Sequence, residues 1–298
     1  MNQKTVKAFT LLELLVVITI IGVLSSIVVV SLSGSTDSAD IAKIQPFSHQ
    51  VHALLGHEAV LDLNFNENSF DSCPDLSDAC DASGKGNNGT FYGSTSFVTS
   101  QVDGYAASFD GSGDYVEIDP DLLDNACSGT VMLWFKRGEW AAQYSTIFSK
   151  SNGGSWNNNH IQIARNSLAD ALHLTISNNV SSTGANVLSG AIEIDKWYHI
   201  AMTWNGSVLK GYQNGVLVDY YNTSICLPGD STKVVIAKGA AGTERYFNGV
   251  IDEVRAYEEA LNISEIQKHY AEGLKKFLAQ EPANRKDSDF RAGEIIFE

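Results

Sequence analysis

The sequence predicts a mainly β protein, with a long hydrophobic α-helix at its N-terminus, an antiparallel β-sandwich of the jelly-roll type after it, and a short C-terminal helix. Three observations lead to this prediction. Residues 14–32 contain no ionisable side chain, residues 59–257 alternate apolar and polar residues in many short runs, and turns rich in glycine and asparagine separate those runs. A two-sheet sandwich buries one face of each of so many short strands.

The first element is an apolar helix behind a short basic leader. At about 1.5 Å per residue, residues 14–32 make a helix of roughly 28 Å, which matches the hydrocarbon thickness of a bilayer. Lys4 and Lys7 precede this run, so we expect a cytoplasmic N-terminus and an exported remainder. Glu13 is the one charge in the longer apolar stretch of residues 9–32, and unpaired in the membrane it costs roughly 3 kcal/mol.

This N-terminus resembles the precursors of type IV pilins and of the pseudopilins of type II secretion. The matching residues are Ala8, Phe9, Thr10, Leu11, Leu12 and Glu13, with Ala8 in the place of the usual glycine. The resemblance implies cleavage between Ala8 and Phe9 by a prepilin peptidase and N-methylation of Phe9. In a filament, the new amine of Phe9 would pair with Glu13 of a neighbouring subunit. The alternative is an ordinary secretory signal cut near residues 31–33.

The second element continues the helix to about residue 58. Apolar residues recur at three- and four-residue spacing between residues 41 and 55, which predicts an amphipathic helix, and Pro46 would kink it. We therefore divide the chain into a leader (1–8), a membrane and assembly helix (9–58), a jelly roll (59–270), and a C-terminal helix with a loose tail (271–298).

The jelly roll is predicted from its strands. We expect them at residues 60–65, 107–109, 115–118, 130–135, 145–150, 160–164, 172–177, 197–205, 209–213, 215–220, 234–237 and 249–257. A helix from residue 264 to about 280 follows, and Pro282 ends it. Trp134, Trp197 and Trp204 alternate within strands and are expected in the core.

Several segments of this region resemble the concanavalin A-like, laminin G-type jelly-roll modules, in family order. They are residues 63–67, 81–89, 107–118, 197–204, 211–215 and 247–255. The resemblance implies a sandwich from about residue 60 to residue 270, with its first and last strands side by side. The segment between Cys73 and Cys80 departs from the family pattern.

Composition limits the partners and the redox state. The formal net charge is −15, without a basic stripe, which disfavours nucleic-acid binding. All four cysteines follow the membrane run and would be oxidised after export. We expect Cys73 to pair with Cys80 and Cys127 with Cys226, although four cysteines allow three connectivities. A zinc site would want a Cys-x-x-Cys pair, which the sequence lacks.

A structural Ca²⁺ site is predicted at the loop of residues 81–89. Asp81 and Asn87 offer oxygens among glycines, which suits a cation that accepts six to eight oxygen ligands. The laminin G-like arrangement would bring Asp252 near this loop and Glu67 to its edge. The alternative is a plain turn, with Asp252 paired to Arg255 or capping backbone groups.

A ligand site is predicted at Trp140, Trp156 and His160, which lie in polar, glycine- and asparagine-rich sequence. Because the resembled fold includes many lectins, exposed aromatic rings there would hold a sugar ring. The alternative is that these aromatic side chains cover the core.

Catalysis is not expected. Glucanases of this fold carry Glu-x-Asp-x-x-Glu, and here Glu117-Ile118-Asp119 is followed by Leu122 where the third acid should stand. We therefore predict a nonenzymatic subunit of a type IV pilus-like surface filament that displays a jelly roll for adhesion.

The expected partners are related pilin subunits, the prepilin peptidase/methyltransferase, the assembly machinery, the inner membrane before assembly, and a glycan or surface ligand. The expected location is the membrane as a single-pass precursor, then the extracellular filament. The alternatives are a type II secretion pseudopilin or minor pilin, and an anchored lectin-like protein that does not polymerise.

Overall fold

The computed structural model describes residues 58–280 apart from 119–120, 143, 152–158, 167–170, 179–181, 188–191, 230–231 and 240–243. The chain splits into two compact units, Met1–Gly56 and His57–Glu298, and the described residues belong to the second. The predicted leader, the membrane helix with Ala8, Phe9 and Glu13, and the loose tail lie outside the described residues. Among the residues that are described, no helix combines the length and apolar composition needed to cross a membrane.

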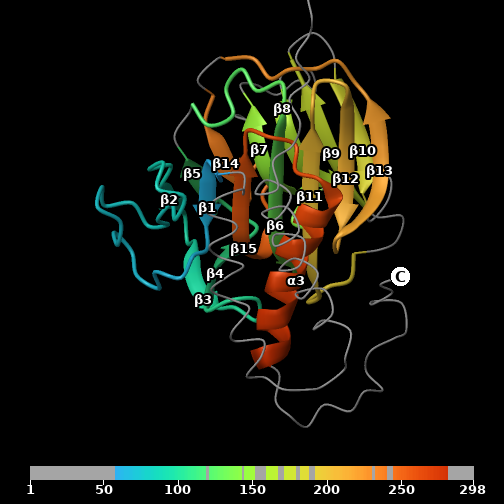
Figure 1. The fold of residues 1–298 in the computed structure, drawn as a ribbon. Helices are drawn as coiled ribbons and strands as arrows, with labels where there is room; N and C mark the ends of the chain where they lie inside the picture. The colour runs from blue at the N-terminus through green and yellow to red at the C-terminus, as the bar shows by residue number, and fades with distance from the viewer. Residues whose placement is uncertain are drawn as a thin grey trace, which may run out of the picture. The chain divides into compact units, whose positions relative to one another are not determined.

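The described unit is built on two antiparallel sheets, as the sequence predicts (Figure 1). One sheet has eight strands in the order β13-β12-β11-β6-β15-β4-β3, with β1 paired to β15, and the other has seven in the order β10-β9-β8-β7-β14-β5-β2. The strands of the first are β1 (Leu61–Leu63), β3 (Ser96–Thr99), β4 (Tyr105–Asp110), β6 (Gly129–Arg137), β11 (Trp197–Trp204), β12 (Val208–Gln213), β13 (Val216–Asn222) and β15 (Asn248–Tyr257). Those of the second are β2 (Gly89–Tyr92), β5 (Tyr115–Ile118), β7 (Thr146–Ser151), β8 (Asn159–Asn166), β9 (Ala171–Ser177), β10 (Ser182–Val187) and β14 (Val234–Ile236). The predicted jelly-roll fold class is confirmed.

The first and last strands of the domain lie side by side, as expected. Leu61 is opposite Ala256 and Leu63 is opposite Val254 in the β1–β15 ladder. Both leucines of β1 are fully buried, so this three-residue strand contributes directly to the core. The pairing brings the N-terminal end of the domain to the strand that precedes the C-terminal helix.

The main core lies between the two sheets. Its largest members include Phe135 of β6, Phe148 of β7 and Trp204 of β11, none of which is exposed to solvent. The indole of Trp204 donates to the carbonyl of Ala126 at 3.2 Å, so its polar atom is satisfied inside the core. Burial of Trp134, Trp197 and Trp204 agrees with the sequence prediction.

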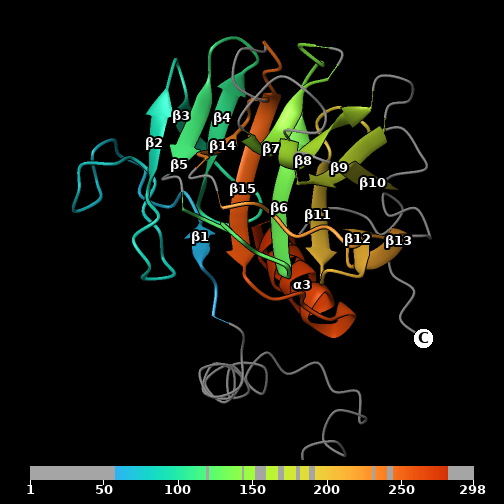
Figure 2. The same cartoon turned by 90° about the horizontal axis from the view of Figure 1, so that it is seen from above.

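The helix α3 (Ile263–Gln280) covers the outer face of the eight-stranded sheet (Figure 2). Asn262 caps its N-terminus: its side-chain oxygen accepts the backbone N–H groups of Ser264 and Glu265, while Glu265 accepts the N–H of Asn262. Trp134 and Trp197 lie beneath the helix instead of between the sheets. Because α3 is one continuous helix, it crosses the predicted domain boundary at residue 270.

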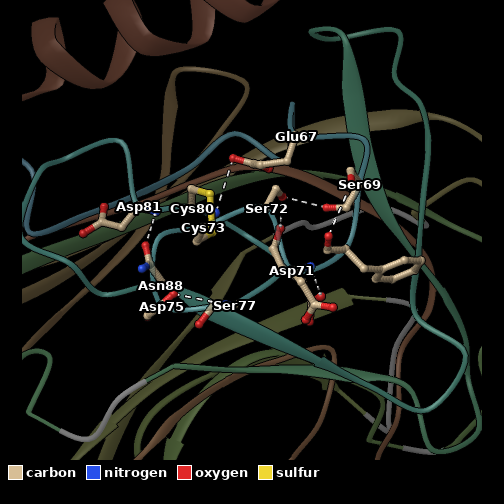
Figure 3. Close-up of a disulfide and its surroundings, with 12 residues drawn as sticks. Glu67, Ser69, Asp71, Ser72, Cys73, Asp75, Ser77, Cys80, Asp81 and Asn88 are labelled. Atoms are coloured by element: carbon tan, nitrogen blue, oxygen red, sulfur yellow. Dashed lines mark hydrogen bonds between the residues drawn. A yellow bond between two sulfur atoms is a disulfide. The ribbon is translucent and has the colours of Figure 1, made fainter.

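Both predicted disulfides are present. Cys73 and Cys80 close a short loop between β1 and β2, which Figure 3 shows with its neighbours. Cys127 and Cys226 join segments 99 residues apart, one before β6 and one after β13. The second bond encloses a much longer piece of chain, so it restricts the unfolded chain more.

Candidate functional site

Asp81 is the centre of the predicted calcium loop. One carboxylate oxygen accepts the N–H groups of Asp62 at 2.9 Å and Ser83 at 3.0 Å. The other accepts the Ser83 hydroxyl at 2.7 Å and the N–H of Asn87 at 2.9 Å. Asn88 completes the turn by accepting the N–H of Asp81 (Figure 3). Four donors therefore point at the carboxylate that was expected to hold a cation.

The other two ligands proposed near this loop also have protein partners. The Asn87 amide donates to the carbonyl of Val60 at 2.7 Å. One oxygen of Glu67 accepts the N–H of Cys80 at 3.3 Å, and the other is buried without a hydrogen-bond partner. Burial raises the pKa of Glu67. Asp81 and Asn87 are thus brought together, and Glu67 is tied to the residue before Asp81.

Asp252 is engaged elsewhere. It lies opposite Trp134 in the β15–β6 ladder and is fully buried. Its carboxylate accepts the hydroxyl of Ser100 and the N–H of Glu253. Burial raises the pKa of Asp252 well above its ordinary value, and the nearby Glu253 carboxylate adds to this.

The residues do not fit a calcium site well. Within the described residues, no group of three or more His, Cys, Asp or Glu side chains is arranged to hold a metal ion. The backbone and hydroxyl donors around Asp81 occupy the directions from which a cation would bind. The loop has the hydrogen bonding of a turn that is closed by its own backbone and hydroxyl donors. Ca²⁺ binding stays a prediction, and these contacts do not favour it.

The ring of Trp140 is not freely accessible for stacking against a sugar. Its ring packs edge-on against Phe247 at 6.3 Å between centroids, beside the core. The guanidinium groups of Arg137 and Arg165 lie 5.0 Å and 5.4 Å from its centroid. These contacts favour the alternative interpretation, in which Trp140 covers the core. Trp156 and the side chain of His160 lie outside the described part of the structure, so the predicted sugar site is untested there.

A group of aromatic side chains that the sequence analysis missed lies on the outer face of the seven-stranded sheet. We call Tyr92, Tyr115, Tyr246 and Lys238 the tyrosine face. Tyr92 and Tyr115 are opposite each other in the β2–β5 ladder, and their rings are parallel with centroids 4.6 Å apart. The Lys238 ammonium lies 3.9 Å from the Tyr115 centroid and 5.8 Å from that of Tyr246. Such spacing suits cation–π attraction.

Charged groups border the tyrosine face. Glu117 follows Tyr115 by two residues in β5 and therefore points to the same side, while Val116 and Ile118 enter the core. Lys233 forms an ion pair with Glu117. Partial burial raises the pKa of Tyr115, and the Glu117 carboxylate adds to the rise. The face thus offers an aromatic ring, hydroxyls, a cation and a carboxylate together.

The same outer face continues as a polar row across β7, β8 and β9. The strand registers place Ser149 opposite Gln162 and Gln162 opposite Thr175. All three side chains are buried although they point away from the core. Ser149 donates to the carbonyl of Lys238 at 2.8 Å, which connects the polar row to the tyrosine face. This face of the sheet is therefore polar and aromatic, and its polar row is covered from solvent.

One sequence signal could have found part of this surface. The alternation Tyr115-Val116-Glu117-Ile118 already places Tyr115 and Glu117 on one side of a strand. The contribution of Tyr92 depends on β2, which was not predicted, and that of Tyr246 on a segment outside any strand. These side chains come together with Tyr115 only through contacts between segments that are far apart in the sequence.

Two segments of the chain match known families. Residues 3–29 match the prokaryotic N-terminal methylation motif. Residues 110–267 match the concanavalin A-like lectin/glucanases superfamily. The first match covers the predicted prepilin segment, and the second covers most of the described sandwich.

One curated relative is similar to the N-terminal part. The chain is 39% identical over 69 residues to type II secretion system core protein G of Klebsiella michiganensis. This alignment covers 23% of the present chain and 44% of that relative, so the chain spans less than half of its length.

Solved structures are similar to the jelly roll. Domain 4 of a GH43 extracellular arabinanase from Geobacillus stearothermophilus, in complex with arabinotriose, has a TM-score of 0.57 at 19% identity, covering 71% of this chain and 98% of that one. The binding domain of Paraclostridial mosquitocidal protein 1 has a TM-score of 0.56 at 14% identity, covering 72% and 52%. The binding domain of botulinum neurotoxin DC in complex with SialylT has a TM-score of 0.57 at 16% identity, covering 72% and 51%.

Identities this low establish the fold alone. The superfamily match extends over more than half of the sequence and coincides with the observed two-sheet architecture. The chain therefore belongs to the concanavalin A-like lectin/glucanases superfamily, and it joins this jelly-roll domain to a prepilin-type N-terminal methylation motif.

Proposed function

We propose that the chain is a subunit of a type IV pilus-like surface filament and that its jelly roll is displayed for adhesion. The methylation motif at residues 3–29 is the observation that carries this proposal. Cleavage after Ala8 would give Phe9 a free amine, and in a filament that amine would neutralise Glu13 of a neighbouring subunit in apolar surroundings. Lateral packing of the helices would hold the subunits together.

A type II secretion pseudopilin is the second candidate, because the curated relative is a core protein of that system. Deletion of the gene separates the two. Loss of surface filaments with normal protein secretion supports the pilus role, whereas loss of secreted proteins with intact filaments supports the pseudopilin role.

The assembly proposal is tested by mass spectrometry and N-terminal sequencing of protein from sheared filaments. We expect a chain that begins at methylated Phe9. Glu13→Ala should remove the protein from the sheared fraction while leaving it in membranes. Glu58→Ala is the matched control, since that carboxylate is exposed and pairs only with Lys85 in the described structure, and it should leave filaments intact. An N-terminus near residue 34 in the mature protein would refute the proposal.

We infer that the displayed domain binds a saccharide on the tyrosine face and that it does so without catalysis. Tyr92 is 39% exposed, with its partner Tyr115 stacked on one side of the ring. The other side is the end of the sheet, because β2 is its terminal strand. An aromatic ring beside polar groups is a common way to hold a sugar. The ion pair between Glu117 and Lys233 favours recognition over acid catalysis.

The binding proposal is tested with arabinotriose and a glycan array on sheared filaments. Tyr92→Ala should weaken binding about tenfold, the effect of losing roughly 1.4 kcal/mol of aromatic contact. Tyr221→Ala is the control, because Tyr221 is similarly exposed, at 41%, but lies on the other sheet. Equal binding by both variants would place the ligand elsewhere.

A further inference from the structure

The tyrosine face is open to solvent at the end formed by β2. Thr90 and Tyr92 are both exposed and lie on the same side of this strand, because they are two residues apart. Phe91 between them packs against the core. Thr90 lies directly opposite Glu117 in the β2–β5 ladder, and Tyr92 lies opposite Tyr115. We call Thr90, Tyr92 and Glu117 the edge site.

The edge site is the accessible end of a row that crosses the sheet. Glu117 lies opposite Val235, and Val235 lies opposite Ser149, the first residue of the polar row. Ser149, Gln162 and Thr175 are at most 3% exposed, whereas the Glu117 side chain is 23% exposed. A ligand on this outer face can therefore reach polar atoms at the edge site and not farther along the row.

The edge site has hydrogen-bonding atoms that the protein leaves unused. The carboxylate of Glu117 receives the Lys233 ammonium and the Tyr92 hydroxyl on the same oxygen, Oε1, the hydroxyl at 3.5 Å. Within the described residues, no donor contacts the second oxygen, Oε2, and the Thr90 hydroxyl has no partner. A carboxylate oxygen accepts hydrogen bonds, and a threonine hydroxyl both donates and accepts them. These atoms suit the hydroxyl groups of a sugar ring stacked on Tyr92.

The charges around the edge site disfavour an acidic ligand. Because Tyr92 is stacked on one face of the Tyr115 ring, the Lys238 ammonium, 3.9 Å from the Tyr115 centroid, must lie on the other face. It is therefore separated from the open side of Tyr92. A second carboxylate, that of Asp114, accepts the backbone N–H of Ser94 just after Tyr92. The formal net charge of the whole chain is −15, so a ligand with its own carboxylate would approach against like charge.

We propose that the edge site takes a neutral saccharide and that Glu117 selects it against acidic saccharides such as uronates. The neutral sugar stacks on Tyr92 and donates a hydroxyl hydrogen to Oε2 of Glu117, which is a charge-assisted hydrogen bond. The carboxylate of a uronate in the same place has no hydrogen to donate and is repelled by Glu117. The selectivity rests on the proposed saccharide binding and adds to it the class of ligand and the residue that discriminates.

Matched pairs of trisaccharides test the selectivity with the full-length protein. The probes are trimers of glucose, galactose and mannose, and trimers of glucuronate, galacturonate and mannuronate with the same linkages. Wild type should bind at least one neutral trimer about tenfold more tightly than its acidic counterpart, as expected for one hydrogen bond to a charged group. Glu117→Gln keeps the shape of the side chain but leaves Lys233 without this carboxylate. It should weaken neutral binding about tenfold and strengthen binding of the acidic counterpart.

Glu193→Gln is the matched control. Glu193 forms a similar exposed ion pair, with Lys196, in the segment before β11 of the other sheet, and its substitution changes the net charge by the same amount. It should leave the affinities for both kinds of trimer unchanged.

The outcomes separate the selectivity from saccharide binding itself. Acidic trimers that bind wild type as tightly as their neutral counterparts, or an unchanged selectivity in Glu117→Gln, would overturn the proposal. Neutral binding that Tyr92→Ala does not weaken would show that the sugar lies away from the edge site. If wild type binds none of the trimers, saccharide binding on the tyrosine face fails, and the selectivity fails with it.

Discussion

His199 and His269 lie between the eight-stranded sheet and α3, where there is little water to solvate a charged ring. The ring of His199 is 1% exposed and contacts Trp134 and Tyr270. Burial lowers the pKa of both histidines to about 3, and the nearby Arg255 guanidinium adds to the effect. The Nδ1 atom of His199 has no hydrogen-bond partner. Both rings are therefore neutral in the fold at any pH above about 4.

This arrangement predicts a specific loss of stability in acid. Below pH 6.5 the unfolded chain binds protons on these histidines and the folded chain does not, so the free energy of unfolding falls as the pH decreases toward 3. Each histidine contributes about 1.4 kcal/mol per pH unit. His199→Phe keeps the ring contacts and should remove one of the two contributions. Denaturant unfolding of the purified protein at pH 7 and pH 5 measures it, with wild type in parallel.

An unchanged pH dependence in His199→Phe would mean that the ring is protonated inside the fold. A loss of stability at pH 7 would mean that its nitrogen atoms make a favourable contact there.

Single residues differ in how far the sequence could predict their role. The proximity of Asp81 and Asn87 could be expected from the sequence, because both lie in one short polar loop. The donors around Asp81 could not be predicted, since one of them is the backbone of Asp62 in β1, 19 residues earlier. The hydroxyl partner of Asp252 could not be predicted either, since Ser100 lies 152 residues away.

At the scale of the element, α3 comes very close to the sheet at Gly273. A Cβ added to Gly273 would lie 2.5 Å from Nε1 of Trp134, well inside van der Waals contact. Helix propensity alone favours Ala over Gly by about 1 kcal/mol. Here the clash must lift α3 or turn the indole, so close packing outweighs propensity.

We therefore expect Gly273→Ala to lower the free energy of unfolding by about 1–3 kcal/mol. Thermal unfolding followed by circular dichroism checks this. Glu272→Ala is the control, since that exposed residue of the same helix should show no comparable loss. A more stable Gly273→Ala protein would show that α3 is not packed this tightly.

Elements were predictable where their pattern was local. Strands such as β5 and β9 alternate apolar and polar residues, and their predicted ends are within one residue of the observed ones. The strands β2 (Gly-Thr-Phe-Tyr) and β3 (Ser-Phe-Val-Thr) were missed because neither alternates apolar and polar residues. The strand β10, Ser-Thr-Gly-Ala-Asn-Val, has no alternation at all and exists through its pairing with β9.

At the scale of the whole molecule, the contacts around Asp81 bear on the predicted cofactor. Its carboxylate already accepts four hydrogen bonds, so the fold is complete without a cation. We expect removal of Ca²⁺ with EGTA to change the Tm by less than about 1 °C. Asp81→Ala, in contrast, should lower the Tm whether or not Ca²⁺ is present. A Tm that rises with Ca²⁺ in wild type and not in Asp81→Ala would show that the loop rearranges to bind the ion.

The order of the strands has a mechanical consequence if the domain follows an assembly helix, as in the proposed filament. A pulling force applied at residue 58 would act first on β1. This strand is held by three ladder positions with β15 and by two buried leucines. The strand β1 should therefore detach first, as a local opening. Unravelling from the N-terminal side could then proceed only as far as Cys127, because its bond to Cys226 keeps the chain between the two cysteines from extending under load. Under load the domain would therefore lengthen by a limited amount. The rest of the sandwich would remain able to refold when the tension falls.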